Sequence, residues 1–127
     1  MIVYLSVPQL IELHKALLRT FGGGRGLRDR AGLASAAARP AATFGGEDLY
    51  PDLAAKTAAL MHSLVLNHPF VDGNKRVAAA AAELFLRING MELDARDEEI
   101  ERVTLAGAAG EVEAEALGIW LRQRMKG

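Results

Sequence analysis

The chain alternates between stretches in which apolar residues recur at helical spacing and short segments rich in Gly, Pro and polar residues. The first periodic stretch follows Ser6 and ends at Gly22-Gly23-Gly24, which is typical of a helix and its stop. Ser6 and Gln9 form a capping-box pattern around Pro8, a residue that the first helical turn tolerates. The pattern therefore predicts a helix that begins after Ser6 and ends at the glycines.

Five further helices are predicted by the same criteria. Asp29 and Asp52 are candidate N-caps, and Pro40 and Pro69 disfavour continuation of the helices that they follow. Asn89-Gly90 is a favourable left-handed stop for another helix. The expected segments are residues 29–38, 52–67, 74–88, 97 to about 107–110, and a last helix that carries residues 112–121.

Other segments lack the helical period. Met1 to Leu5 predicts a short strand, and Met91 to Ala95 an extended segment. Residues 40–51, PAATFGGEDLYP, contain two prolines and a glycine pair, which favour a loop or a short hairpin.

The segment 74–88 is apolar nearly all round, with alanines in its first turns and Leu84, Phe85 and Ile88 in its last. Such a helix is expected at the buried centre of a domain. The predicted fold is an all-α, single-domain bundle over residues 1–127 around this helix.

Composition narrows the classes of function. The 127 residues are 50% hydrophobic and 24% charged, which is ordinary for a globular protein. A formal net charge of -1 gives no field that would attract nucleic acid or an anionic membrane. The chain has no cysteine, so disulfides, thiolate catalysis and Cys-ligated zinc are excluded. Neither a signal peptide nor an apolar run long enough to span a bilayer is evident, so a cytoplasmic protein is expected.

Chemistry concentrates in residues 68–76, HPFVDGNKR, directly before the apolar helix. The first backbone N–H groups of a helix, with its dipole, bind anions. Gly73 permits close approach of a ligand, Lys75 and Arg76 add positive charge, and Asn74 can cap the helix or hold a phosphate oxygen.

The remaining groups of this segment suit phosphate chemistry. Asp72 is its one carboxylate and, beside phosphates, a natural Mg²⁺ ligand. His68 can accept a hydroxyl proton near neutral pH, and Phe70 would anchor the loop in the core. The alternative is an ordinary polar loop that caps a core helix. Two cations in a first helical turn oppose the dipole, however, which favours a bound anion.

The segment HPFVDGNKR resembles the signature of the Fic/Doc superfamily, and specifically of its death-on-curing (Doc) toxin branch, H-x-F-x-[D/N]-[A/G]-N-K-R. All fixed positions of that signature match. The stretches GLRD, FGGEDLYP and FLRINGMEL are also similar, so the resemblance extends along the chain. It departs from the Fic branch, H-x-F-x-[D/E]-G-N-G-R-x-x-R, because Lys75 replaces a glycine and Ala79 stands at the final arginine.

The resemblance implies an ATP- and Mg²⁺-dependent phosphotransferase that moves the γ-phosphoryl group to a threonine of elongation factor Tu and blocks translation. His68 would be the base and Asp72 the Mg²⁺ ligand, while Asn74, Lys75, Arg76 and the Gly73 amide would hold phosphates. A Fic-type AMP transferase, or a catalytically idle binding module, is the alternative.

The resemblance also implies partners. The loop that contains Phe44, Glu47 and Tyr50 corresponds to a flap that docks the target by strand addition; its alternative is a plain interhelix loop. The stripe of Leu117, Trp120 and Leu121 is expected in the core, and any part of it that stays uncovered would be the groove for an antitoxin helix. His14 and His62 lack metal-ligand spacing and fit core positions.

Overall fold

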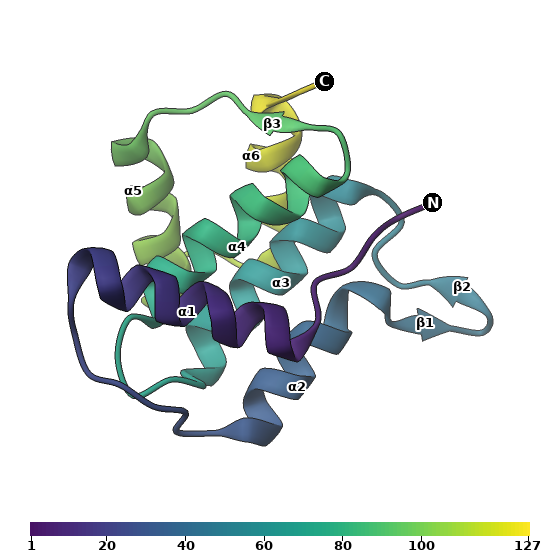
Figure 1. The fold of residues 1–127 in the computed structure, drawn as a ribbon. Helices are drawn as coiled ribbons and strands as arrows, with labels where there is room; N and C mark the ends of the chain where they lie inside the picture. Colours follow the sequence, from purple (N-terminus) through teal and green to yellow (C-terminus); the bar gives the residue numbers. More distant parts are fainter.

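The computed structural model describes all 127 residues and contains six α-helices (Figure 1). The all-α prediction is confirmed. The helices are α1 (Val7–Phe21), α2 (Arg30–Ala38), α3 (Leu53–Asn67), α4 (Asn74–Ile88), α5 (Asp97–Ala108) and α6 (Ala114–Arg124), with a 3-10 turn η1 (Arg39–Ala41) after α2.

The predicted caps form as expected at three helix starts. Ser6 and Gln9 complete the capping box of α1, while the carboxylates of Asp29 and Asp52 accept hydrogen bonds from backbone N–H groups in the first turns of α2 and α3. Such caps satisfy donors that a helix cannot pair internally, which is why short polar residues located these helices correctly.

The core lies around α3 and α4, which cross the middle of the molecule (Figure 1). Helix α3 is the more deeply buried and packs against α4 and α6. The prediction that 74–88 is the buried central helix holds for one face only, that of Val77, Ala78, Ala81, Ala82, Phe85 and Leu86. Its other face carries Lys75, Arg76 and Glu83 toward the surface, which leaves that face free for a site.

Two short antiparallel pairs complete the fold. The predicted hairpin is present as β1 (Thr43–Phe44) and β2 (Glu47–Asp48), and β3 (Glu92–Leu93) pairs with β4 (Met125–Lys126) at the C-terminus. The strand predicted at Met1–Leu5 is wrong: the segment forms no strand, and the side chain of Asn89 instead bonds both backbone groups of Val3. None of the helices combines the length and apolar character that crossing a bilayer requires.

Candidate active site

The loop 68–73 connects the end of α3 to the start of α4, and His68 is its first residue. His68 adopts the left-handed conformation, with φ 45° and ψ 55°, which a non-glycine residue adopts only at a cost. Arg28 holds it there: its Nε donates to the His68 carbonyl at 2.7 Å and its Nη2 to that of Asn67 at 2.8 Å. The imidazole itself stays exposed.

The interior of the loop is fixed by Phe70, Asn74 and His14. The Phe70 ring is 2% exposed, which confirms it as the apolar anchor. The Asn74 amide accepts a hydrogen bond from the Phe70 N–H and donates one to its carbonyl, both at 2.9 Å. The buried His14 ring stacks on Phe70 at 4.0 Å, and its Nε2 lies 2.8 Å from the Asp72 carbonyl oxygen. Because a carbonyl only accepts, that nitrogen carries a proton.

A second backbone segment, the glycine-rich stretch 22–28, runs along the loop. The N–H groups of Arg28 and Asp29 both donate to the Pro69 carbonyl, and the Val71 N–H donates to the Gly26 carbonyl. The stretch does end α1, as predicted, and it also supports the loop.

Gly24 and Gly23 bring this stretch against Asp72. The Gly24 N–H donates to Asp72 Oδ2 at 3.1 Å. Gly23 has φ +118°, and a Cβ there would lie 2.9 Å from the same oxygen, so only glycine fits. The glycines therefore position the Asp72 carboxylate, and they form no separate phosphate-binding loop.

Asp72 is held as an anion. Hydrogen bonds from the backbone N–H groups of Gly24 and Gly73 lower the pKa of its carboxyl below the ordinary value. Its side chain is exposed, and each oxygen accepts only one backbone hydrogen bond, so further lone pairs remain.

This carboxylate fits a Mg²⁺ ion that arrives with phosphate oxygens, because Mg²⁺ often takes one protein carboxylate and completes its shell with substrate and water. A cage of three or more His, Asp or Glu groups, which would hold a metal without a substrate, does not form.

The start of α4 leaves positive charge and donors uncompensated. Its N-cap, Gly73, has φ 81° and no side chain to cap the helix, and the first turn contains no acidic residue. Neither Lys75 nor Arg76 forms a salt bridge; the Arg76 guanidinium lies 4.3 Å from the Phe21 ring centre, over its face. This is the predicted misfit with the helix dipole, and an anion would relieve it.

These groups share one cavity of about 800 Å³, the motif cavity, which lies between α1, α4, α5 and the loop. The predicted residues that line it are His68, Asp72, Gly73, Asn74, Lys75 and Arg76. The volume falls within the range of pockets that bind small ligands.

The two ends of the motif cavity differ in charge. Beyond Arg76, the lining residues of α4 are Ala79, Ala80 and Glu83, and α5 adds Asp97 and Glu101. Burial raises the pKa of Glu83, and the nearby Asp97 carboxylate raises it further. Cations and free N–H groups thus lie at one end, where Asp72 is the one carboxylate, and the other carboxylates lie at the opposite end.

The hairpin β1–β2 is not part of this cavity. Phe44, Glu47 and Tyr50 are absent from its lining, and the Tyr50 hydroxyl accepts a hydrogen bond from Arg39 Nε at 2.7 Å. Asp48, beside Glu47, pairs with Lys56 in the first turn of α3, about 18 Å along the helix axis from His68. The structure therefore does not bring the predicted flap residues to the motif.

The α6 stripe lies mainly in the core, as predicted, so it offers no groove for an antitoxin helix. Leu117 and Leu121 are fully buried, and Arg124 lies over the half-buried Trp120 ring. The stripe belongs to the core.

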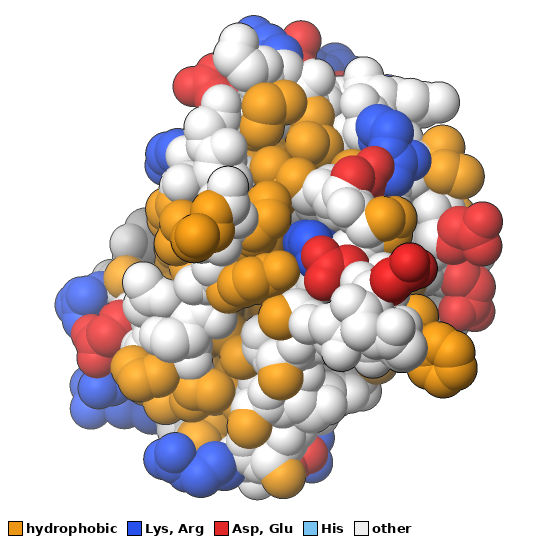
Figure 2. Space-filling model, turned by 90° about the vertical axis from the view of Figure 1, so that its right-hand side faces the viewer, with side chains coloured by type: hydrophobic (Ala, Val, Ile, Leu, Met, Phe, Trp, Pro, Cys, Tyr) orange, Lys and Arg blue, Asp and Glu red, His pale blue; other side chains and the backbone are white.

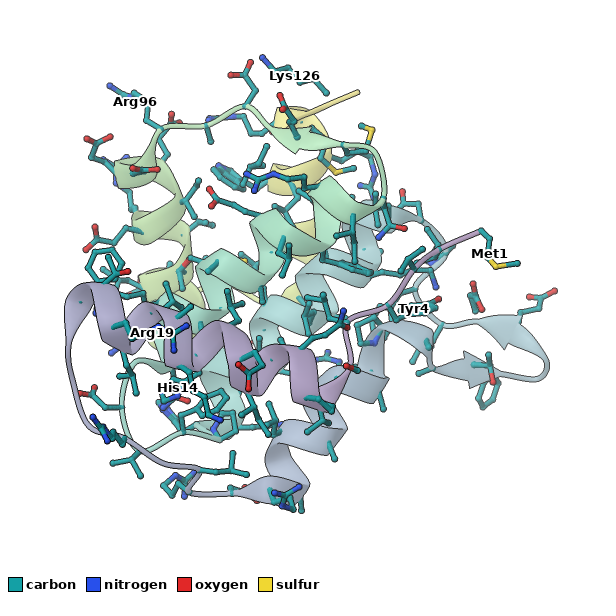
Figure 3. All side chains as sticks on the ribbon, in the orientation of Figure 1. Met1, Tyr4, His14, Arg19, Arg96 and Lys126 are labelled. Atoms are coloured by element: carbon teal, nitrogen blue, oxygen red, sulfur yellow. The ribbon has the colours of Figure 1, made fainter.

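Sequence reasoning missed the role of His14, because it lies on α1, far from the motif in sequence. In Figure 3 His14 lies on the lower side of α1, toward the loops that connect α1 to α2 and α3 to α4. Its helical spacing with Leu10 and Leu17 indicated burial, but no sequence signal identified the Asp72 carbonyl as its partner.

The fold and this loop define a protein of the Fic/DOC family, to which the chain belongs: residues 4–86 match that family. Among curated proteins, "Toxin Doc" of Mycolicibacterium smegmatis is 54% identical over 82 residues, which cover 65% of this chain and 62% of that protein. "Protein kinase doc" of Escherichia phage P1 is 31% identical over 120 residues, which cover 94% of each chain. The resemblance to the Doc branch is thereby confirmed.

Proposed function

We propose that this chain is a Doc-like toxin that transfers the γ-phosphoryl group of ATP to a threonine hydroxyl of elongation factor Tu and so arrests translation. The names of its two relatives, a toxin and a protein kinase, support this class of activity. Residues 1–127 would act as one Fic/Doc domain, because a continuous core joins helices from both ends of the chain. The place of action would be the cytoplasm, where the factor works.

The residues of the motif cavity suit the parts of this transfer. The exposed His68 imidazole would take the proton of the acceptor hydroxyl as its oxygen attacks the γ-phosphorus, and the bond to the β-phosphate oxygen would break to release ADP. Lys75, Arg76 and the unpaired N–H groups of α4 would stabilise the phosphate charges. When bound at Asp72, Mg²⁺ would supply further neutralisation of the phosphate oxygens.

One observation carries the choice of phosphoryl rather than AMP transfer: the motif cavity is cationic only at the first turn of α4. Ala79 lines the wall where the Fic pattern has an arginine, and carboxylates follow it. A polyphosphate that ran along α4 would meet Glu83, Asp97 and Glu101, whose charges repel it. A nucleotide with its terminal phosphate at the first turn, next to His68, avoids that repulsion.

An antitoxin is the expected partner, and a surface other than the α6 stripe is needed for it. Figure 2 shows hydrophobic side chains gathered in a band on the face that carries the hairpin, broken by a group of acidic and basic residues. Exposed apolar residues of the N-terminal segment and the hairpin include Met1, Val3, Phe44 and Leu49. An amphipathic antitoxin segment would cover part of this band.

The test is transfer of label to purified elongation factor Tu from ATP that carries the label at either the γ- or the α-phosphate. The proposal expects label from the γ-position only, with ADP as the second product. Label from the α-position only would overturn it in favour of AMP transfer.

Growth arrest on expression gives an independent check. If His68→Ala and Asp72→Ala each abolish the growth arrest, an idle binding module is excluded. If both variants remain as toxic as the parent chain, the assignment of the motif cavity as the active site is wrong.

A further inference from the structure

A second cavity, of about 710 Å³, lies on the other side of the motif loop and shares no lining residue with the motif cavity. We call it the basic cavity. It is lined by one face of α1, the segment 22–27, Arg30 and Phe70. Its charged lining residues are Lys15, Arg19, Arg25 and Arg30. No acidic residue lines it, which is unusual in a chain of net charge -1.

Three of the four cations have no internal partner. Lys15 lies 3.4 Å from the Glu12 carboxylate, but Arg19, Arg25 and Arg30 form no salt bridge. Like charges that surround one cavity repel each other, and a bound anion would remove this repulsion. Arg19 is labelled in Figure 3, on the same helix as His14.

The inner lining of the basic cavity is apolar. It reaches the ring of Phe70, 2% exposed, and that of His14, 4% exposed, and Ile11, Leu18 and Leu27 form its other apolar walls. An inorganic anion would gain nothing from such a lining. A cavity that penetrates to core rings, within the volume range of small-molecule sites, instead suits a ligand with an apolar body and an anionic group.

We propose that the basic cavity binds a small organic anion with an apolar body, and that its occupancy acts on the motif loop. The apolar body would pack on Leu18 and Leu27 while guanidinium groups pair with the anionic group. That this would modulate phosphoryl transfer rests on the proposed function, but binding itself does not.

Two contacts connect the basic cavity to the catalytic carboxylate. The His14 ring lines the cavity and binds the Asp72 carbonyl through Nε2. The neighbouring segment, with Gly23 and Gly26 in the lining, includes Gly24, whose N–H binds Asp72 Oδ2. A ligand that orders these groups would fix the position of Asp72.

Binding is tested with the fluorescent probe 8-anilinonaphthalene-1-sulfonate, which has an aromatic body and one sulfonate. We expect saturable binding with one site per chain, weakened at least about tenfold in the variant R19Q/R25Q/R30Q. The matched control, R87Q/R102Q/K126Q, removes three exposed cations that line neither cavity and should bind as the parent chain does. Cooperative unfolding of each variant must be verified, because the probe also binds partly folded states.

Two outcomes would overturn the site. One is equal weakening in both triple variants, which would mean that net charge alone attracts the probe. The other is displacement of the probe by millimolar inorganic phosphate, which would mean a plain anion site without need of an apolar body.

Coupling to the loop is tested by amide NMR of the same complex. Saturation with the probe should shift the amide signals of Gly24, Asp72 and Gly73 more than that of Gly110, which lies in the turn after α5. In His14→Phe, which keeps an aromatic ring against Phe70 but lacks the donor, the probe should still bind while the Asp72 shift shrinks. Saturable binding with no shift at these three amides would refute the coupling, whether or not the chain transfers phosphate.

Discussion

The charged groups on the hairpin side of α3 are paired within the chain, whereas the cations of the motif at its other end are not. On the hairpin side, the buried Lys56 ammonium donates to Asp48 at 3.0 Å and to the Pro40 carbonyl at 3.2 Å. There too, the guanidinium of Arg39 binds the Tyr50 hydroxyl and Ser63 Oγ, at 2.7 and 2.8 Å. These charged side chains thus find hydrogen-bond partners within the chain.

At the motif end of α3 the loop is held by other means. Its path is fixed by backbone groups, the Asn74 amide and the His14 ring. The Arg28 guanidinium also fixes it by donating to carbonyl oxygens. Lys75 and Arg76 are left without carboxylate partners. The charged groups of the loop are therefore available to a ligand, because backbone groups, neutral side chains and Arg28, which lies outside the loop, hold its path. Loss of a side chain on the hairpin side should cost stability, and loss at the motif end should cost activity.

His68→Ala provides the largest expected contrast. The rate of phosphoryl transfer should fall by about 10²–10⁴, the range for loss of a general base. The free energy of unfolding should change by less than about 1 kcal/mol, because the His68 ring is exposed and because histidine and alanine bear a similar cost in the left-handed region. Label transfer from γ-labelled ATP and urea denaturation measure the two effects. A large loss of stability with little loss of rate would reverse the roles assigned to the two sides of α3.

Arg39→Ala should give the opposite result. It leaves the hydroxyl of Ser63 and the Nδ1 atom of His62 without the donor that they share, and both side chains are buried. We expect a loss of about 1–3 kcal/mol of unfolding free energy and an unchanged transfer rate. Tyr50→Phe, which removes only one acceptor of this guanidinium, should cost less. Loss of transfer in Arg39→Ala at full stability would place the hairpin side in the active site after all.

Asn74 connects the two kinds of effect, since it is a motif residue with a structural contact. Asn74→Ala removes two hydrogen bonds to the Phe70 backbone and should destabilise the chain by about 1–2 kcal/mol while it slows transfer. Asn74→Asp keeps the acceptor and loses the donor, so its unfolding free energy should lie between those of the parent chain and the alanine variant. If the alanine and aspartate variants unfold alike, the acceptor half of the contact contributes nothing.

Lys75→Ala should slow transfer and yet stabilise the fold by about 0.3–1 kcal/mol, because a cation in the first turn of α4 opposes the helix dipole. Arg87, in the last turn of the same helix, provides the matched control. There the cation favours the dipole, so Arg87→Ala should destabilise by a similar amount. Thermal denaturation at low ionic strength distinguishes the two signs, and equal signs would remove the electrostatic argument for an anion site.

The helices and the motif cavity could be predicted because their signals are local. Caps such as Ser6 and Asp52 and the stop at Asn89-Gly90 depend on neighbours along the chain. The nine-residue motif contains its own loop and helix start, so the residues predicted from it line one cavity. Their roles in transfer remain predictions.

What escaped prediction depends on contacts between distant segments. His14 meets Asp72, and Gly24 meets the same residue, across more than 45 positions of sequence. The burial of α3 exceeds that of α4 because helices pack on it from several sides, which the apolar pattern of a single helix does not reveal. The hairpin was found from its glycine pair, but its place relative to His68 depends on the Lys56 and Arg39 contacts.

His62 offers the smallest effect, a pH dependence on the hairpin side alone. Burial lowers the pKa of its imidazole below 6.5, the Arg39 charge lowers it further, and Glu113 partly opposes them. The Arg39 guanidinium can only donate, so Nδ1 of His62 accepts and the ring is neutral. Below pH 6.5 the unfolded chain therefore binds a proton that the folded chain does not, and the unfolding free energy should fall as the pH drops from 6.5 toward the lower folded pKa. Urea denaturation at a series of pH values should show a shallower fall in His62→Asn than in the parent chain, and identical pH profiles would mean that the folded state accepts the proton without penalty.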